Sequence, residues 1–90
     1  MSQAIVDPDD LVLFAQELRH LNSELYARLT GVKGKFDQLG DSWRDQEQAK
    51  FAQEFEQTVQ ALVRFMDVVE EQIPFLMRKA EAARNYQNQQ

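Results

Sequence analysis

Apolar residues in the first half of the chain recur at steps of three or four positions. The series is Leu11, Phe14, Leu18, Leu21, Leu25, Leu29, Val32, Phe36, Leu39 and Trp43. This spacing keeps one stripe on one face of a helix for many turns. Asp7 and Pro8 precede it, and they are typical of a helix start because Asp caps free amides and Pro fits the first helical position. We therefore predict a helix over about 8–39.

The second half of the chain has the same helical spacing. Its apolar series is Phe51, Phe55, Val59, Leu62, Met66, Val69, Ile73, Leu76, Ala80 and Ala83. Ser42-x-x-Asp45 and Asp45-x-x-Gln48 both resemble capping boxes, which leaves the start open by about one turn. Pro74 predicts a kink near residues 70–74 and not an end, because the apolar spacing resumes after it. We predict this helix over about 45–85.

The segment between the two helices, about 40–45, contains the only tryptophan of the chain, Trp43. Gly40 is well placed to end the first helix in a left-handed conformation. Trp43 is expected to fill the bend and to pack on Leu39 and Phe51. Residues 1–90 are thus predicted to form a single all-α domain, an antiparallel two-helix hairpin with a Trp turn.

Two helices leave much apolar surface in water, because each can bury only one face on the other. A second hairpin would cover the excess and complete a four-helix bundle. We expect the core and dimer contacts to come from one stripe on each helix: Leu18, Leu21, Leu25, Phe51, Phe55, Leu62, Met66 and Val69. The acidic start of the first helix should lie beside the basic residues Arg78, Lys79 and Arg84 in such a hairpin.

Composition and charge exclude several classes of protein. The 90 residues include 43% hydrophobic residues, three Gly and two Pro, a balance that favours a few long helices. A net charge of −5 argues against a nucleic-acid partner, which needs a basic face. No apolar run is long enough to span a membrane, and Met1 to Asp10 lack the features of a cleavable signal peptide.

The residues do not suggest catalysis, a metal or a cofactor. Glu17 and His20 have the Glu-x-x-His spacing of di-iron bundles, but His20 lies away from the apolar face and is the only histidine. Glu70 and Glu71 are neighbours that point in different directions on a helix. No Ser or Thr has a base at a useful spacing. The sequence predicts a protein that binds other helices and is not an enzyme.

The Trp turn between two long helices resembles the WXG (Trp-x-Gly) hundred-residue superfamily, the small early-secreted-antigen-like proteins of type VII secretion. The residues that carry the likeness are Trp43, Ala49, Phe51, Leu62, Met66, Ile73, Leu76, Ala80 and Tyr86. The resemblance covers nearly the whole chain and implies a hairpin that forms homodimers or heterodimers with a related WXG-type protein. It also implies export as a folded dimer, with a secretion ATPase as a further partner.

Two positions depart from the family pattern. Asp45 stands where the motif Trp43-Arg44-Asp45 should have glycine, and Gln90 stands where the export tail beginning at Tyr86 should have Asp or Glu. Asp can cap a helix and tolerates turns, so the first departure is compatible with the fold. The second leaves two hypotheses. The protein is either secreted without a cleavable signal peptide, as substrate or carrier, or a cytoplasmic helical adaptor or structural module that is not exported.

Overall fold

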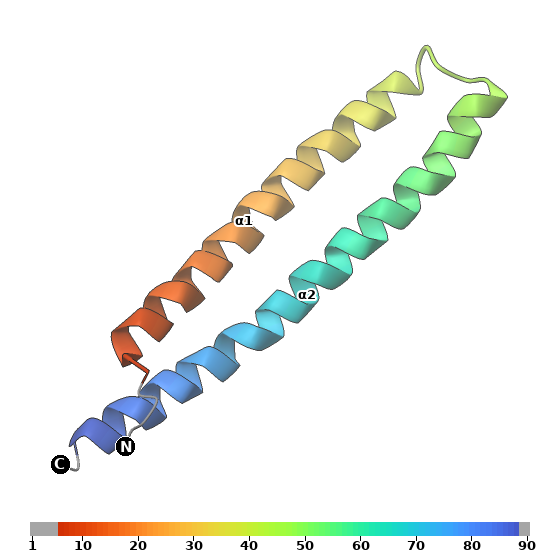
Figure 1. Ribbon diagram of the computed structural model, residues 1–90. Helices are drawn as coiled ribbons and strands as arrows, with labels where there is room; N and C mark the ends of the chain where they lie inside the picture. The colour runs from red at the N-terminus through yellow and green to blue at the C-terminus, as the bar shows by residue number, and fades with distance from the viewer. Residues whose placement is uncertain (1–5, 89–90) are drawn as a thin grey trace.

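Two long antiparallel helices make up the structure, a computed structural model that describes residues 6–88 (Figure 1). Helix α1 spans Pro8–Leu39 and α2 spans Gln46–Asn88. No strand occurs within the described range. The hairpin is a flat rod of 68 × 18 × 15 Å, so it has one helix–helix seam and no enclosed interior. The all-α hairpin predicted from the apolar spacing is confirmed.

Helix α1 begins and ends at the predicted residues, but the conformation of the residue that follows it differs from the prediction. The Asp7 carboxylate accepts a hydrogen bond of 2.9 Å from the Asp9 amide, and Pro8 occupies the first turn. Gly40 was predicted to be left-handed, but it has φ −61° and ψ −18°, a right-handed conformation. Its amide bonds to the Asp37 carbonyl at 3.1 Å. The helix therefore tightens into a final i→i−3 turn, which satisfies its last carbonyls without a positive φ.

Short-range hydrogen bonds hold the bend. The Trp43 amide donates to the Leu39 carbonyl at 2.8 Å, and Arg44 Nε donates to the Gly40 carbonyl at 2.8 Å. The Asp45 carboxylate then accepts from the Gln48 amide at 2.9 Å. Of the two possible starts, the one capped by the Asp45 side chain is therefore adopted, and α2 begins at Gln46. The helix continues unbroken through Pro74.

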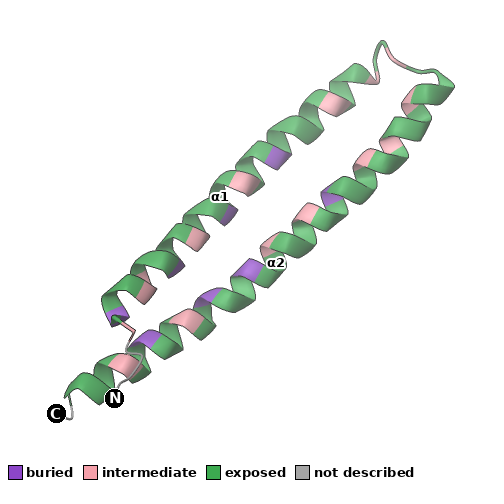
Figure 2. Ribbon diagram, viewed as in Figure 1, coloured by how far each residue is buried: buried purple, intermediate pink, exposed green. Residues whose placement is uncertain are grey.

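Buried residues line the inner edges of both helices, while their outer edges are exposed (Figure 2). The buried positions are Pro8, Ala15, Asn22 and Leu29 on α1, and Val59, Val69, Ile73 and Ala80 on α2. Ala15, Val69 and Ile73 form the central cluster, against which Leu18 and Leu76 pack. Buried positions seven residues apart, such as Ala15 and Asn22, indicate a regular heptad seam.

This seam is rotated from the stripe predicted for the first helix. Phe14 is 54% exposed and Leu21 is 43% exposed, whereas Ala15 and Asn22, one position further along, are buried. Small side chains at the seam let the two helices approach closely, so the bulkier neighbours are displaced to its margin. Phe14 and Leu21 therefore lie beside the seam and not in it.

An ion pair joins the start of α1 to the end of α2, in agreement with the sequence. Arg84 Nη2 lies 2.9 Å from the Asp9 carboxylate and joins the last turns of α2 to the first turn of α1. Both side chains are largely exposed, so the pair contributes little to stability and mainly marks the register of the hairpin.

Candidate interaction surface

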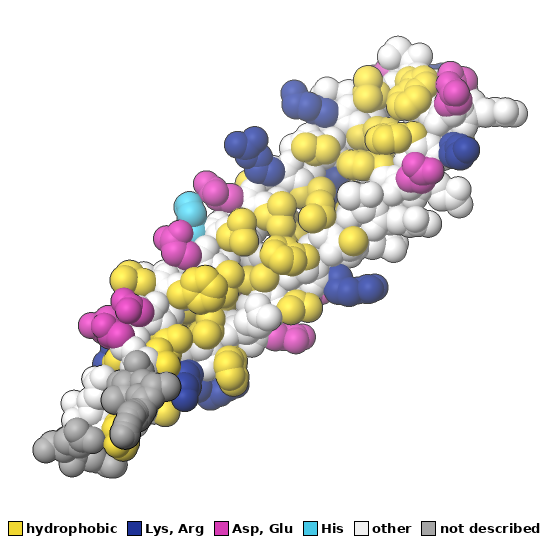
Figure 3. Space-filling view, in the orientation of Figure 1, with side chains coloured by type: hydrophobic (Ala, Val, Ile, Leu, Met, Phe, Trp, Pro, Cys, Tyr) yellow, Lys and Arg dark blue, Asp and Glu magenta, His cyan; other side chains and the backbone are white. Residues whose placement is uncertain are grey.

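One broad face of the hairpin carries an almost continuous apolar band over both helices, with charged side chains along its margins (Figure 3). We call it the apolar face. Its α1 members are displaced from the seam and recur at steps of three, four or seven residues, which keeps them on one side of the helix: Phe14, Leu21, Leu25, Val32, Phe36 and Leu39. Its α2 members are Phe51, Phe55, Leu62 and Phe65.

An aromatic cluster forms the part of the apolar face nearest the turn. Phe36 contacts Phe55 at 5.0 Å and Phe51 at 5.6 Å between ring centroids, and Trp43 lies 6.0 Å from Phe51. Phe51 and Phe55 stack at 6.0 Å. The three Phe rings line a shallow groove of about 570 Å³, which Val32 and Leu39 extend. The cluster packs the bend and still presents apolar rims to solvent, as a docking surface does.

The residues predicted to form the recognition motif lie at the turn and at the far end of the rod. Trp43 is half-buried against Phe51, in agreement with its predicted role as a wedge, while Arg44 and Asp45 are exposed and hold the bend. Tyr86 is exposed near the end of α2. Gln90, the other predicted tail residue, lies outside the described residues.

The eight residues of the predicted core and dimer stripe fall into three groups. Val69 is buried in the seam. Half-buried positions at the edges of the seam are occupied by Leu18, Leu25, Phe55, Leu62 and Met66. Leu21 and Phe51 are exposed on the apolar face. One stripe therefore supplies both the contacts inside the hairpin and the unpartnered surface beside them.

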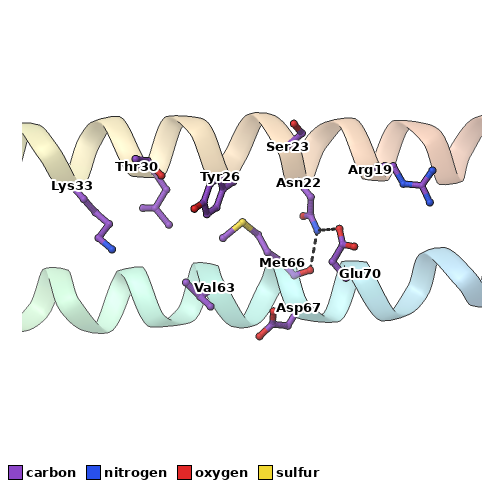
Figure 4. A pocket seen from close by; sticks show the side chains of 11 residues that line it. Arg19, Asn22, Ser23, Tyr26, Thr30, Lys33, Val63, Met66, Asp67 and Glu70 are labelled. Carbon is purple, nitrogen blue, oxygen red and sulfur yellow. Dashed lines mark hydrogen bonds between the residues drawn. The ribbon is translucent and has the colours of Figure 1, made fainter.

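The opposite edge of the seam carries a polar groove of about 540 Å³ (Figure 4). Asn22, which sequence reasoning missed, is 6% exposed and donates from Nδ2 to the Met66 carbonyl at 2.9 Å and to Glu70 Oε2 at 3.0 Å. Its Oδ1 has no hydrogen-bond partner among the described residues. Its position seven residues after Ala15 was the signal that could have identified it. The groove is also lined by Arg19, Ser23, Tyr26, Thr30, Lys33, Val63 and Asp67.

The histidine and acidic side chains of residues 6–88 do not cluster into a metal site. His20 lies 3.4 Å from Glu24 on the exposed side of α1. Within residues 6–88 no group of three or more His, Asp or Glu side chains is close enough to hold a metal ion. No helix in this range is both long and apolar enough to cross a membrane.

Solved structures similar to this hairpin include those of a secreted protein, EsxB of Bacillus anthracis strain Sterne. Its selenomethionine-labelled crystal structure is 26% identical, has a TM-score of 0.80, and the match covers 97% of this chain and 99% of that one. A point mutant of the same protein is 27% identical over 94% of this chain and 98% of that one, with a TM-score of 0.78. No curated protein matches the chain significantly.

The family comparison agrees with the Trp turn and with the hairpin. The model described as proteins of 100 residues with WXG matches residues 3–89, which is nearly the whole chain. The matched range includes Trp43 at the bend and both helices. This chain therefore belongs to the WXG100 family.

Proposed function

We propose that the protein is a small secretion protein that works by protein–protein binding, as a substrate or carrier partner of a type VII secretion system. The observation that carries the proposal is the apolar face, on which residues such as Phe14, Leu21 and Phe65 remain about half exposed. Burial of such a side chain stabilises an assembly by about 1 kcal/mol or more. A hairpin with this face in water is therefore expected to bind a partner.

The partner we propose is a second hairpin, either another copy or a related WXG-type protein. Two flat hairpins that meet by their apolar faces form a four-helix bundle, and a twofold axis lets the same surface serve both subunits. The charged margins of the face would form the rim of the interface, as is common where an apolar core is surrounded by polar residues.

The proposed export signal is composite. Trp43 and Tyr86 lie at opposite ends of a rod 68 Å long, so one hairpin cannot present them together. In an antiparallel dimer, the turn of one subunit comes beside the tail of the other. Trp43 and Arg44 of one subunit and Tyr86 of its partner could then be bound as one unit by a secretion ATPase.

A second candidate is a cytoplasmic adaptor or structural module that is not exported. Gln90 favours it, because a neutral side chain stands where the family's export tail has Asp or Glu. The same apolar face would then serve only to bind another helical protein.

Secretion from a host with an intact type VII system tests the two candidates. We expect the native protein outside the cell, Trp43→Ala and Tyr86→Ala retained inside, and Gln90→Glu exported more efficiently. Tyr26→Ala is the matched control, because Tyr26 is as exposed as Tyr86 but lies on the polar groove. Circular dichroism of each variant establishes that it is folded. Retention of both the native protein and Gln90→Glu would contradict export and support the adaptor.

A further inference from the structure

The outer edges of the two helices, which face away from the seam, differ in charge. The outer edge of the first half of α1 carries Asp10, Glu17 and Glu24, with the exposed Leu13 among them. The outer edge of the second half of α2 carries three basic residues, Arg64, Arg78 and Lys79, and one acidic residue, Glu71, around the exposed Val68 and Phe75. Among the described residues, Arg64, Arg78 and Lys79 have no ion-pair partner within the hairpin. One edge is therefore acidic and the other basic, and both are partly apolar.

Oppositely charged and apolar residues of these edges lie at the same levels along the rod, with one like-charged pair, Glu17 and Glu71. The bond between Asn22 and the Met66 carbonyl fixes the register of the antiparallel helices. Leu13 and Phe75 each lie nine residues from that pair, so they are level along the rod, and they are 59% and 60% exposed. By the same reasoning Asp10 is level with Arg78, and Glu24 with Arg64. Hairpins placed side by side without an axial shift would bring these residues together.

The middle of the two edges permits close approach. Ala27 of α1 and Ala61 of α2 are both exposed and lie level with each other, five residues from Asn22 and from Met66 respectively. Beyond Ala27, a Cβ at Gly31 would meet nothing within 4 Å, so the outer side of α1 is open there. Small residues at a contact let helix axes come close together.

We propose that the acidic outer edge of α1 binds the basic outer edge of α2 in another copy of the chain, so that hairpins align laterally. The contact is heterologous, because it joins two different surfaces, and it therefore extends into an open row unless curvature closes it. It goes beyond the proposed dimer and uses other residues, since the outer edges lie away from the apolar face. Its small area makes the association weak and dependent on protein concentration.

A charge swap at the level pair Glu24 and Arg64 tests the proposal by sedimentation velocity over a wide range of protein concentrations. The native protein should form species that exceed the dimer and grow with concentration. Glu24→Arg and Arg64→Glu should each weaken this growth about fivefold, the effect of roughly 1 kcal/mol, because each brings like charges together. The double variant, which has the native composition, should restore it.

Net charge is controlled by comparing two variants that change it equally. In the proposed contact, Glu71 of one copy lies level with Glu17 of the next, and these like charges repel. Glu71→Lys should therefore strengthen lateral association. Glu24→Arg changes the net charge by the same amount and should weaken it. If both variants strengthen association, net charge alone is responsible and the proposal is wrong.

The apolar part of the contact is tested by Phe75→Ser, with Tyr26→Ser as the control for loss of an exposed aromatic ring on another face. Phe75→Ser should weaken the rows about tenfold, while Tyr26→Ser should leave them unchanged. Lateral association should persist in Leu21→Glu, because this substitution alters only the apolar face. Failure of the dimer and failure of the lateral contact are therefore distinguishable. A native protein that stays at one mass at every concentration would overturn the proposal.

Discussion

Asn22 is a polar side chain in an otherwise apolar seam, and its hydrogen bonds explain its position. Its amide nitrogen bridges the Met66 carbonyl and the Glu70 carboxylate, and so ties α1 to one place on α2. Its Oδ1 is buried and has no hydrogen-bond partner within residues 6–88, and an unsatisfied buried acceptor costs about 1–3 kcal/mol. A single buried Asn is known to fix helix register at the expense of stability in coiled coils. We expect Asn22 to have this role here.

Two substitutions of Asn22 should therefore change the free energy of unfolding in opposite directions. Asn22→Leu should raise the free energy of unfolding by about 1 kcal/mol, because it removes the unpaired oxygen and adds apolar contact. Asn22→Asp should lower it by about 2 kcal/mol, because it buries a charge beside Glu70. Urea unfolding at a fixed protein concentration measures both, and Ser23→Leu, one position outside the seam, is the control. A loss of stability in Asn22→Leu equal to that in Asn22→Asp would contradict this role.

Within α1, two glycines lie where nothing requires glycine. A Cβ at Gly31 or at Gly34 would meet no atom within 4 Å, and both positions are helical. Gly31→Ala and Gly34→Ala should therefore each raise the free energy of unfolding by about 1 kcal/mol, through helix propensity alone. Thermal unfolding followed by circular dichroism measures the gain. Gly40→Ala is the control and should give none, because its Cβ would lie 3.2 Å from the Asp37 carbonyl. Unchanged stability in both helical variants would show that propensity is offset elsewhere.

The spacing of apolar residues was sufficient to predict the helices but not the seam between them. Phe14 and Leu21 are the more hydrophobic residues, yet the seam is formed by their smaller or polar neighbours Ala15 and Asn22. Which of two adjacent faces packs depends on how closely the helix axes approach, and hydrophobicity alone does not contain this information. The caps at Asp7 and Asp45 depend on local spacing and could be predicted, although two starts were open for α2.

As a whole molecule, the hairpin is a flat rod whose surfaces differ in polarity and charge. One broad face is apolar, the opposite side of the seam is a polar groove, and the two outer edges carry opposite charges. A rod 15 Å thick cannot enclose the apolar side chains that two long helices carry. The sequence indicated this excess, but not which residues form it, because that depends on the rotation of the seam.

The oligomeric state at low protein concentration tests the central claim most directly, and the chain offers a matched pair of variants. Leu21 and Leu13 are both exposed leucines of α1, but Leu21 belongs to the apolar face and Leu13 to the outer edge. In sedimentation velocity at micromolar concentration, the native protein and Leu13→Glu should be dimers, and Leu21→Glu should be a folded monomer, because a charge would be buried at the interface. A native protein that sediments as a folded monomer, or a Leu21→Glu variant that remains fully dimeric, would contradict the account.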